Sequence, residues 1–565
     1  MYQNGMLWIA AGENGKKICL EPAKANRHGL VAGATGTGKT VTLKVMAESF
    51  SDAGVPVFLA DVKGDLAGMV NQGTPNKNVD ERVQRFGIDN WSFRSYPTRF
   101  WDVYGKSGHP LRTTISEMGP LLLSRVLDLN QTQTGILNIA FRVADENGLL
   151  LLDMKDLKAI LNFVSENAKE LSGEYGNITP QSVNTIIRSL IYLEDSGGNQ
   201  FFGEPAFDVR DWLETTYDGR GWINILHCVE LFQSPKLYST FLLWMLSELY
   251  ENLPEAGDLT KPKIVFFFDE AHLLFDDAPK ILLQKIEQVV RLVRSKGVGV
   301  YFVTQSPTDI PGDILAQLGN RVQHALRAYT PAEQKKVRAA ADTFRANSEF
   351  RTLDAIMELA TGEALVSFLG DDGAPTPVER AWILPPQSQM GSIDDAERAD
   401  AIRRDGIGSR YDEIVDRESA YELLAQKAEE SAREYEEYLA ELQRQKEEEA
   451  AQKAAEKEAL AAQKAAEKEA LAQQKAEEKA ALAAEKEKQK KATQRVNKVQ
   501  RIATTAASSA TRSVISNTIR RPVSKKQSIA TNAINSAFNS TVNGIGREIS
   551  GSLVRGIFGT FTKKK

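Results

Sequence analysis

The sequence predicts an α/β fold whose central sheet is mostly parallel. Short apolar runs alternate with helical patterns, and the runs lie at 29–33, 55–60, 222–226, 264–268 and 298–304. Within each run the apolar residues are nearly continuous, which is typical of strands buried on both faces. A glycine-rich loop joins the first run directly to a helical pattern. Strands and helices that alternate in this way predict a sheet with helices packed against it.

Length and composition limit the class of protein. A chain of 565 residues exceeds one ordinary hydrophobic core and favours several domains. Cys19 and Cys228 lie far apart and lack metal-ligand spacing, so neither a disulfide framework nor a zinc site is predicted. The start has no charged leader followed by an apolar stretch, and polar residues interrupt the most apolar later segment, 236–250. We therefore expect a soluble, cytoplasmic protein without a transmembrane segment.

Changes of composition along the chain predict three regions. Residues 1–395 carry the α/β pattern and form the expected core, with a helical insertion at 104–221. Residues 396–491 form a long charged helix, because glycine and proline are absent from 409–521. A basic, low-complexity tail occupies 492–565.

An eleven-residue repeat supports the long helix. The sequence AAQKAAEKEAL occurs at 450–460 and again at 461–471, and a relative of it follows. Eleven residues make three turns of 3.67 residues each, so Leu460, Leu471 and Leu482 stay on nearly one face. The leucine stripe is thin, so a solvated single helix and a coiled coil both remain open.

The tail is the basic part of an acidic chain. From Lys490 to Lys565 there are fifteen Lys and Arg residues and one acid, Glu548, while the whole chain has a net charge of -5. Such a segment suits contact with nucleic-acid phosphate, with a protein partner, or with an anionic membrane surface. The residues alone leave these three targets open.

One loop matches the complete phosphate-binding pattern G-x-x-x-x-G-K-[ST] between a predicted strand and a predicted helix. Its glycines let backbone N–H groups approach phosphate oxygens, and the following helix adds its positive N-terminal end. Lys39 is expected to reach the β- and γ-phosphates of ATP, and Thr40 to hold Mg²⁺. The predicted nucleotide-binding residues are Gly33, Ala34, Thr35, Gly36, Thr37, Gly38, Lys39, Thr40 and Val41.

Two other strand ends supply the remaining chemistry. Asp269 follows a five-residue apolar run and is predicted to hold Mg²⁺, and Glu270 to activate the attacking water. Gln305 ends the last predicted strand, where an amide can sense the γ-phosphate or merely close the strand. The letters DEAH also occur in the DEAH-box RNA helicases, but the other motifs of those enzymes are absent from this sequence. We therefore interpret His272 as a local packing or hydrogen-bonding residue.

The motifs together resemble the HerA/FtsK clade of ring-forming P-loop ATPases, and within it the HerA-like branch typified by bacterial YjgR. The resemblance is carried by NRHGLVAGATGTGKTVTLK, FLADVKGDL, FFFDEAHLLF, RLVRSKGVGVYFVTQSPTDIP and LGNRVQHALRA. Segments of the insertion and of the C-terminal region extend it. It implies a RecA-like core, ATP and Mg²⁺ as cofactors, and a hexameric ring with arginines supplied from the neighbouring subunit.

The resemblance also assigns single residues. Arg321 and then Arg294 are the expected arginines acting between subunits, and Asp61 resembles the acid near the metal and the water. Lys63 faces either nucleotide or DNA. HerA itself has an N-terminal β-barrel that docks a nuclease, whereas about 28 residues precede the loop here, so a nuclease partner is not predicted.

Two functions therefore remain open. The first is an ATP-hydrolysing motor that moves along nucleic acid, with double-stranded DNA as the expected substrate. The second is a P-loop ATPase that remodels a protein partner through the long helix and the tail. Net charge does not separate them, because a basic channel is a small part of a ring's surface.

Overall fold

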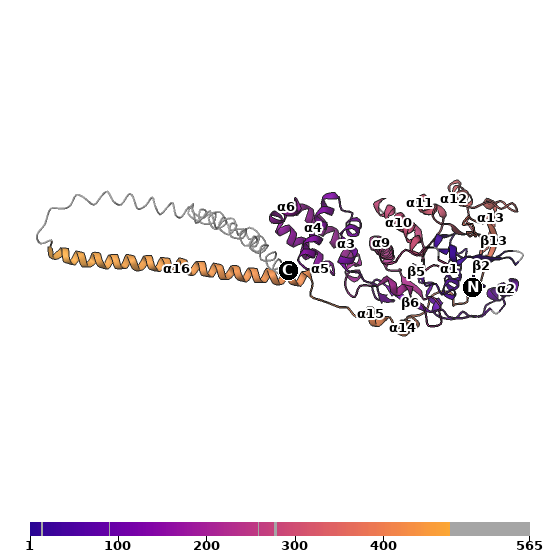
Figure 1. The fold of residues 1–565 in the computed structure, drawn as a ribbon, viewed down its shortest axis with the longest axis horizontal. Coiled ribbons are helices and arrows are strands. Elements are labelled where there is room, and N and C mark those ends of the chain that lie inside the picture. The colour runs from indigo at the N-terminus through magenta and orange to yellow at the C-terminus, as the bar shows by residue number, and fades with distance from the viewer. Residues whose placement is uncertain (13–14, 90, 258, 276–279, 475–565) are drawn as a thin grey trace. The chain divides into compact units, whose positions relative to one another are not determined.

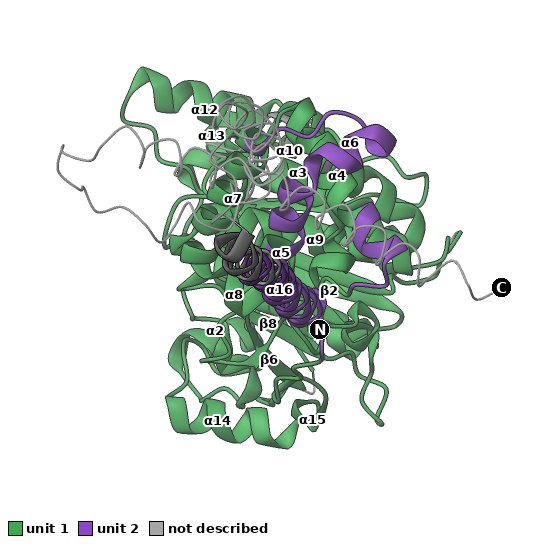
Figure 2. Cartoon of the chain, turned by 90° about the vertical axis from the view of Figure 1, so that its left-hand side faces the viewer, with its two compact units in different colours: residues 1–141, 150–158, 181–417 green, residues 142–149, 159–180, 418–565 purple. Residues whose placement is uncertain are grey.

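The structure, a computed structural model, describes residues 1–474 except 13–14, 90, 258 and 276–279 (Figure 1). The chain divides into two compact units, coloured separately in Figure 2. Unit 1 contains residues 1–141, 150–158 and 181–417, and unit 2 contains 142–149, 159–180 and the described residues from 418 onward. Every residue that the sequence singles out for the site lies in unit 1.

A thirteen-stranded mixed sheet forms the centre of unit 1. Its parallel part runs, in spatial order, β11 (Asn320–His324), β4 (Gly29–Ala32), β10 (Val298–Thr304), β9 (Ile264–Phe268), β5 (Val57–Asp61), β8 (Ile223–His227), β6 (Thr98–Asp102) and β7 (His109–Pro110). Antiparallel strands extend the β11 edge: β12 (Glu363–Ser367), β13 (Glu379–Ile383) and β2 (Met6–Gly12), with β1 (Tyr2–Gln3) and β3 (Lys17–Leu20) both paired to β2. The mostly parallel sheet predicted from the sequence is confirmed.

The apolar runs form strands because both of their faces are covered. In β9, the Phe267 ring packs 6.2 Å from the Phe50 ring on one face, and the Phe266 ring packs 6.0 Å from the Trp212 ring on the other. Burial of this kind stabilises the fold by about 25 cal/mol per Å² of apolar surface. The five predicted strands are β4, β5, β8, β9 and β10, and they are neighbours in the sheet.

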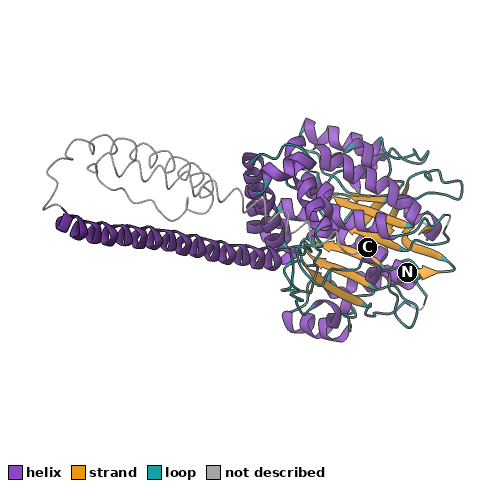
Figure 3. Cartoon of the chain, turned by 60° about the vertical axis from the view of Figure 1, so that its left-hand side comes forward, coloured by secondary structure: helices purple, strands orange, loops and turns teal. Residues whose placement is uncertain are grey.

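Helices flank the strands on both faces (Figure 3). Outside the 104–221 region they are α1 (Lys39–Asp52), α2 (Lys77–Arg85), α9 (Pro235–Asn252), α10 (Lys280–Val293), α11 (Gly312–Leu315), α12 (Pro331–Ala341), α13 (Thr352–Glu358), α14 (Asp395–Arg404) and α15 (Gly408–Tyr411). Between β7 and β8 lie α3 (Ile115–Val126), α4 (Gln131–Glu146), α5 (Met154–Glu166), α6 (Ala168–Tyr175), α7 (Pro180–Leu193) and α8 (Asn199–Phe201). Helices thus occupy most of the region where the sequence predicts a helical insertion, and they are divided between the two units.

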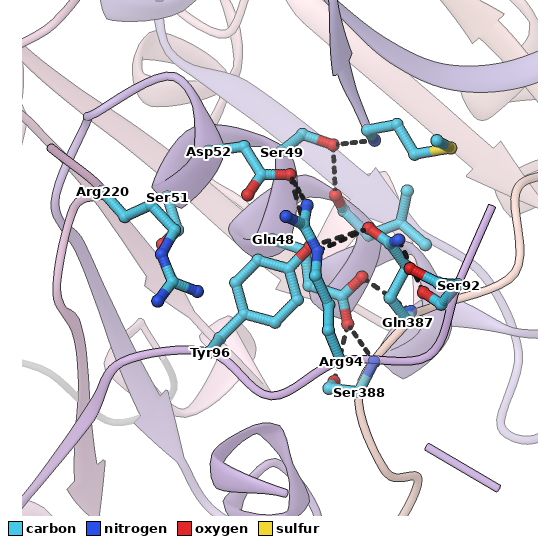
Figure 4. Close-up of polar contacts among 12 residues, drawn as sticks. Glu48, Ser49, Ser51, Asp52, Ser92, Arg94, Tyr96, Arg220, Gln387 and Ser388 are labelled. Atoms are coloured by element: carbon cyan, nitrogen blue, oxygen red, sulfur yellow. Dashed lines mark hydrogen bonds and ion pairs between the residues drawn. The ribbon is translucent and has the colours of Figure 1, made fainter. Parts of the chain in front are cut away.

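The last part of unit 1 anchors α1, the helix that follows the phosphate-binding loop. The Glu48 carboxylate accepts the backbone N–H groups of Gln387 and Ser388 at 2.9 and 3.0 Å, as Figure 4 shows. Next to it, Arg94 forms an ion pair with Asp52. These contacts anchor the C-terminal end of α1, the helix that begins at the phosphate-binding loop.

The long charged helix predicted from the sequence is present as α16 (Ala420–Gln474) in unit 2. The rest of that prediction, 475–491, and the predicted tail, 492–565, lie outside the described residues. In the part of the chain that the structure describes, no helix is long and apolar enough to cross a membrane.

Candidate active site

The predicted site residues meet at one edge of the parallel sheet. Thr304 of β10 lies level with Ala32 of β4, and Phe268 of β9 lies level with Ala60 of β5. All four strands run in the same direction, so the residues that end or follow them share the carboxyl edge, where open α/β sheets bind ligands. These residues are Gly33, Asp61, Asp269 and Gln305.

Two glycines give the phosphate-binding loop a shape that no side chain would allow. At Gly33 the backbone φ is +155°, and a Cβ would lie 2.5 Å from the Cβ of His324. Gly38 has a φ of +116° and caps the start of α1, where a Cβ would lie 3.1 Å from Gly362. The loop therefore keeps its backbone bare beside the N-terminus of α1, as phosphate binding requires.

Lys39 and Thr40 begin α1 and face the site. The Lys39 ammonium donates to the carbonyls of Gly33 and Ala34 at 2.6 and 3.1 Å, and burial lowers its pKa. The Thr40 hydroxyl lies 3.5 Å from Oδ2 of Asp65. Of the other loop positions, Thr37 is buried, Thr35 and Gly36 are exposed, and Val41 is partly buried.

Asp269 and Glu270 occupy the end of β9. Burial raises the pKa of Asp269 to about 6, Lys63 opposes this shift, and Glu270 adds to it. Glu270 has a φ of +48° and a ψ of +45°, a left-handed conformation that is uncommon for a residue with a side chain and is concentrated at functional sites.

Three side chains surround the Glu270 carboxylate. Lys63 donates to its Oε1 at 2.6 Å, and the Gln305 amide donates to its Oε2 at 3.5 Å. His272 Nδ1 lies 3.4 Å from Oε2 without hydrogen-bond alignment. Burial by itself raises the pKa of Glu270, but its hydrogen bond and charge interaction with Lys63 outweigh burial, so the pKa is lowered. Glu270 is therefore ionised at neutral pH.

Asp61 and Asp65 share the loop after β5 but differ in their partners. The Asp61 carboxylate accepts the backbone N–H groups of Gly64 and Leu66 at 2.7 and 3.1 Å. Burial, with the charge of Asp65 second, raises the pKa of Asp61 to about 6. Asp65 approaches Thr40 with one oxygen, and its Oδ1 is buried without a hydrogen-bond partner. Asp61 thus orders the loop, and Asp65 presents a carboxylate to the site.

These residues fit ATP and Mg²⁺. Side chains at Gly33 or Gly38 would collide with His324 or Gly362 and so distort the loop, and Oδ1 of Asp65 is buried without a hydrogen-bond partner. Magnesium prefers oxygen ligands and takes one or two carboxylates together with phosphates. The Thr40 hydroxyl beside the Asp65 carboxylate, and Asp269 directly after β9, supply oxygen atoms of this kind at the same edge of the sheet. No cluster of three or more His, Cys, Asp or Glu residues that could hold a metal alone occurs among the described residues.

The sequence did not single out Asp65 or His324. His324, at the end of β11, lies under the loop, and its Nε2 is 2.7 Å from the Thr42 hydroxyl. Asp65 lies within FLADVKGDL (58–66), and His324 lies within LGNRVQHALRA (318–328). Neither has a signal of its own, because the turn after β5 and the packing under Gly33 decide which side chains face the site.

Arg321 and Arg294 lie away from this edge. Arg321 is level with Leu30, in the first half of β4, and Arg294 precedes β10 on the short helix η7 (Arg294–Lys296). The Arg321 guanidinium donates to the carbonyls of Leu318, Thr343 and Leu315 at 3.0, 2.7 and 3.2 Å. A role of Arg321 between subunits would require these three contacts to be given up.

A glycine-rich phosphate loop that joins a strand to a helix defines a P-loop NTPase fold, here with β10 inserted between the loop strand and the acid strand. The chain belongs to the family described as "Helicase HerA-like C-terminal", whose model matches residues 7–496. The resemblance predicted from the motifs is confirmed at this level.

Two archaeal proteins are similar in sequence. The "DNA double-strand break repair helicase HerA" of Sulfolobus acidocaldarius is 22% identical over 370 residues, covering 62% of this chain and 63% of that protein. The protein of the same description from Sulfurisphaera tokodaii is 21% identical over 355 residues, covering 60% and 62%. The chain thus spans less than two thirds of the length of either relative.

Two solved structures are also similar to this chain, at lower sequence identity than the archaeal relatives. The plasmid coupling protein TrwB in complex with ADP and Mg²⁺ has a TM-score of 0.45 and 16% identity, covering 66% of this chain and 88% of that one. VirB4 of Thermoanaerobacter pseudethanolicus has a TM-score of 0.44 and 14% identity, covering 68% and 97%.

Proposed function

We propose that this protein is a Mg²⁺-dependent ATPase that moves nucleic acid, specifically double-stranded DNA, through a ring of identical subunits. The carrying observation is that the phosphate loop, Asp269 and Glu270 meet at one edge of the sheet, with Gln305 donating to Glu270. A protein that only binds nucleotide needs no carboxylate held for proton transfer. Family membership and the two HerA relatives support nucleic acid as the substrate.

The roles of the residues follow from their positions. When bound, MgATP supplies the phosphoanhydride bond that is cleaved and a metal charge that neutralises the phosphates. The loop N–H groups and Lys39 bind the phosphates, and Thr40, Asp65 and Asp269 hold the cation through oxygen atoms. Glu270 accepts the proton of the attacking water, a function that contributes about 10²- to 10⁴-fold to a rate.

Gln305 is placed to transmit the state of the site. Gln305 directly follows β10 and its amide donates to Glu270 at 3.5 Å, while the preceding Thr304 hydroxyl donates to Asp309 at 3.0 Å. A change in the contacts of the Glu270 carboxylate therefore reaches Gln305, and through it the segment between β10 and β11. Such a path turns hydrolysis into movement of a neighbouring segment.

Assembly into a ring completes the proposal. Arg294 and Arg321 lie toward the amino edge of the sheet, so they serve a neighbouring subunit's site rather than their own. Both arginines remain candidates, because Arg321 donates to three carbonyls of its own chain that it would have to release, and Arg294 also has an interaction within the chain. An arginine supplied in this way is typically worth about 10³-fold or more in rate. Subunits with Arg321→Ala and subunits with Arg294→Ala are each tested alone and mixed with Lys39→Ala subunits; the variant that lacks the acting arginine should be inactive alone and regain activity in the mixture.

The test of the function is the ATPase rate with and without duplex DNA, single-stranded DNA and RNA, using Lys39→Ala as the matched inactive control. We expect Mg²⁺-dependent hydrolysis that duplex DNA stimulates most. Hydrolysis that no nucleic acid changes would instead support an ATPase that remodels a protein partner.

A further inference from the structure

Lys63 lies between the solvent and the catalytic carboxylate. Its ammonium is 2.6 Å from Oε1 of Glu270. The two partners differ sharply in exposure, since the Lys63 side chain is 42% exposed and the Glu270 side chain is 8% exposed. A ligand that comes from solvent can therefore reach Lys63 while Glu270 remains covered.

The ion pair with Lys63 engages the Glu270 carboxylate, which is the group that must accept a proton. A carboxylate activates water through an oxygen lone pair, and here the Lys63 ammonium takes Oε1 while the Gln305 amide approaches Oε2. The imidazole of His272 stands on the same Oε2 side at 3.4 Å. In this arrangement the Glu270 carboxylate, just after β9, already accepts hydrogen bonds from Lys63 and Gln305.

Lys63 differs in this respect from Lys39. The Lys39 ammonium is buried in the phosphate loop and contacts the carbonyls of Gly33 and Ala34. Lys63 comes from the neighbouring loop after β5, which Asp61 orders through the N–H groups of Gly64 and Leu66. Lys39 thus serves the nucleotide, and Lys63 is a second cation whose ordinary ligand, a phosphate oxygen, can approach from outside.

We propose that Lys63 is a positioning residue that locks Glu270, and that a backbone phosphate of bound nucleic acid releases the lock by taking the Lys63 ammonium. The inference rests on the proposed function and adds its control step. Without nucleic acid the base is paired and hydrolysis is slow; with nucleic acid the base is free and ATP is consumed. A ligand shifts such an equilibrium because it binds only one of the two arrangements.

The test compares Lys63→Ala, Lys63→Arg and Lys106→Ala with the wild-type full chain. Lys106 is the matched control, because it also pairs with a glutamate, Glu230, at 2.6 Å but does not contact Glu270. We expect the basal ATPase rate of Lys63→Ala to rise by roughly 1.5- to fivefold, the range for a partly exposed ion pair. Duplex DNA should no longer stimulate it. Lys63→Arg, which keeps the cation, and Lys106→Ala should both retain a low basal rate and stimulation.

A second readout needs no hydrolysis. Duplex DNA binding is measured without nucleotide at increasing salt, and loss of one phosphate contact should reduce the slope of log affinity against log salt by about one in Lys63→Ala. Lys106→Ala should keep the wild-type slope. A purely structural role of Lys63 would leave the slope and the stimulation ratio unchanged.

Two results would overturn the inference. A basal rate that falls in Lys63→Ala while DNA still stimulates would mean that Lys63 serves the nucleotide instead. Equal stimulation of Lys63→Ala and wild type would exclude release through this residue and leave the proposed function intact. If the wild type neither binds nor responds to nucleic acid, the proposed function fails first, and release by nucleic acid fails with it.

Discussion

The Thr42 hydroxyl lies 2.7 Å from Nε2 of His324 and joins α1 to β11 beneath the phosphate loop. The other ring nitrogen, Nδ1, lies 3.1 Å from the Glu363 carbonyl. A carbonyl only accepts, so Nδ1 carries the hydrogen and Nε2 accepts from Thr42. Burial lowers the pKa of His324 to about 4, which keeps the ring neutral.

Thr42→Val should destabilise unit 1, because it leaves Nε2 of His324 buried without a donor. The expected loss in the free energy of unfolding is about 1–3 kcal/mol. Urea denaturation checks it, and Thr42→Ser, which keeps the hydroxyl, is the control. Equal stability of the valine and serine variants would show that this contact does not support the loop.

The two acids of the loop after β5 should respond differently to removal of their charge. Asp65→Asn should raise the Mg²⁺ concentration needed for half-maximal ATPase by roughly 10- to 100-fold, because the Asp65 carboxylate faces Thr40. Asp61→Asn should instead lower the melting temperature, since the Asp61 carboxylate holds two backbone N–H groups. A Mg²⁺ titration and a thermal melt of each variant check this. An unchanged Mg²⁺ requirement in Asp65→Asn would remove Asp65 from the metal site.

The sequence predicted the strands that carry the site but not all of the sheet. The run 264–268 could be predicted because five apolar residues in a row are typical of a strand covered on both faces. In contrast, β11 contains Asn320, Gln323 and His324, which are polar and buried. Asn320 is tolerated there because its amide donates to the carbonyls of Lys24 and His28, both at 3.1 Å. These partners are remote in sequence, so no local pattern reveals the strand.

The site shows the same division between local and remote information. Gly33, Lys39 and Thr40 are predictable because the backbone conformation of the loop and its phosphate chemistry fix the residue types. The choice between Asp61 and Asp65 depends on how one turn folds. The Lys63–Glu270 pair joins residues 207 positions apart, so it follows from the fold and not from either motif.

A buried histidine should make stability depend on pH. His109 Nδ1 lies 2.7 Å from Asp412, and its Nε2 lies 3.0 Å from Asp405. Burial alone would lower the pKa of His109, but its hydrogen bonds and charge interactions with the two carboxylates outweigh burial, so the pKa is raised. The histidine therefore binds its proton more tightly in the folded state than in the unfolded chain.

The sign of the effect follows from the raised pKa. The stabilisation is complete below the unfolded pKa of about 6.5 and is lost as the pH rises through the folded value. His109→Gln should reduce stability at pH 6 by about 1–3 kcal/mol and by less at high pH. Urea denaturation of both proteins across pH 6–9 measures this difference. A difference that stays constant, or grows with pH, would contradict the charged arrangement.

We propose that Glu270 activates water at a site whose phosphates bind the loop at Gly33–Thr40. The most direct test of this proposal measures ATP binding and ATP turnover on the same samples of wild type and Glu270→Gln. The glutamine side chain keeps the size and the polarity of glutamate, but its amide does not accept a proton at neutral pH. We expect unchanged MgATP affinity and a turnover rate lower by about 10²-fold or more. Turnover at the wild-type rate in Glu270→Gln would contradict the account.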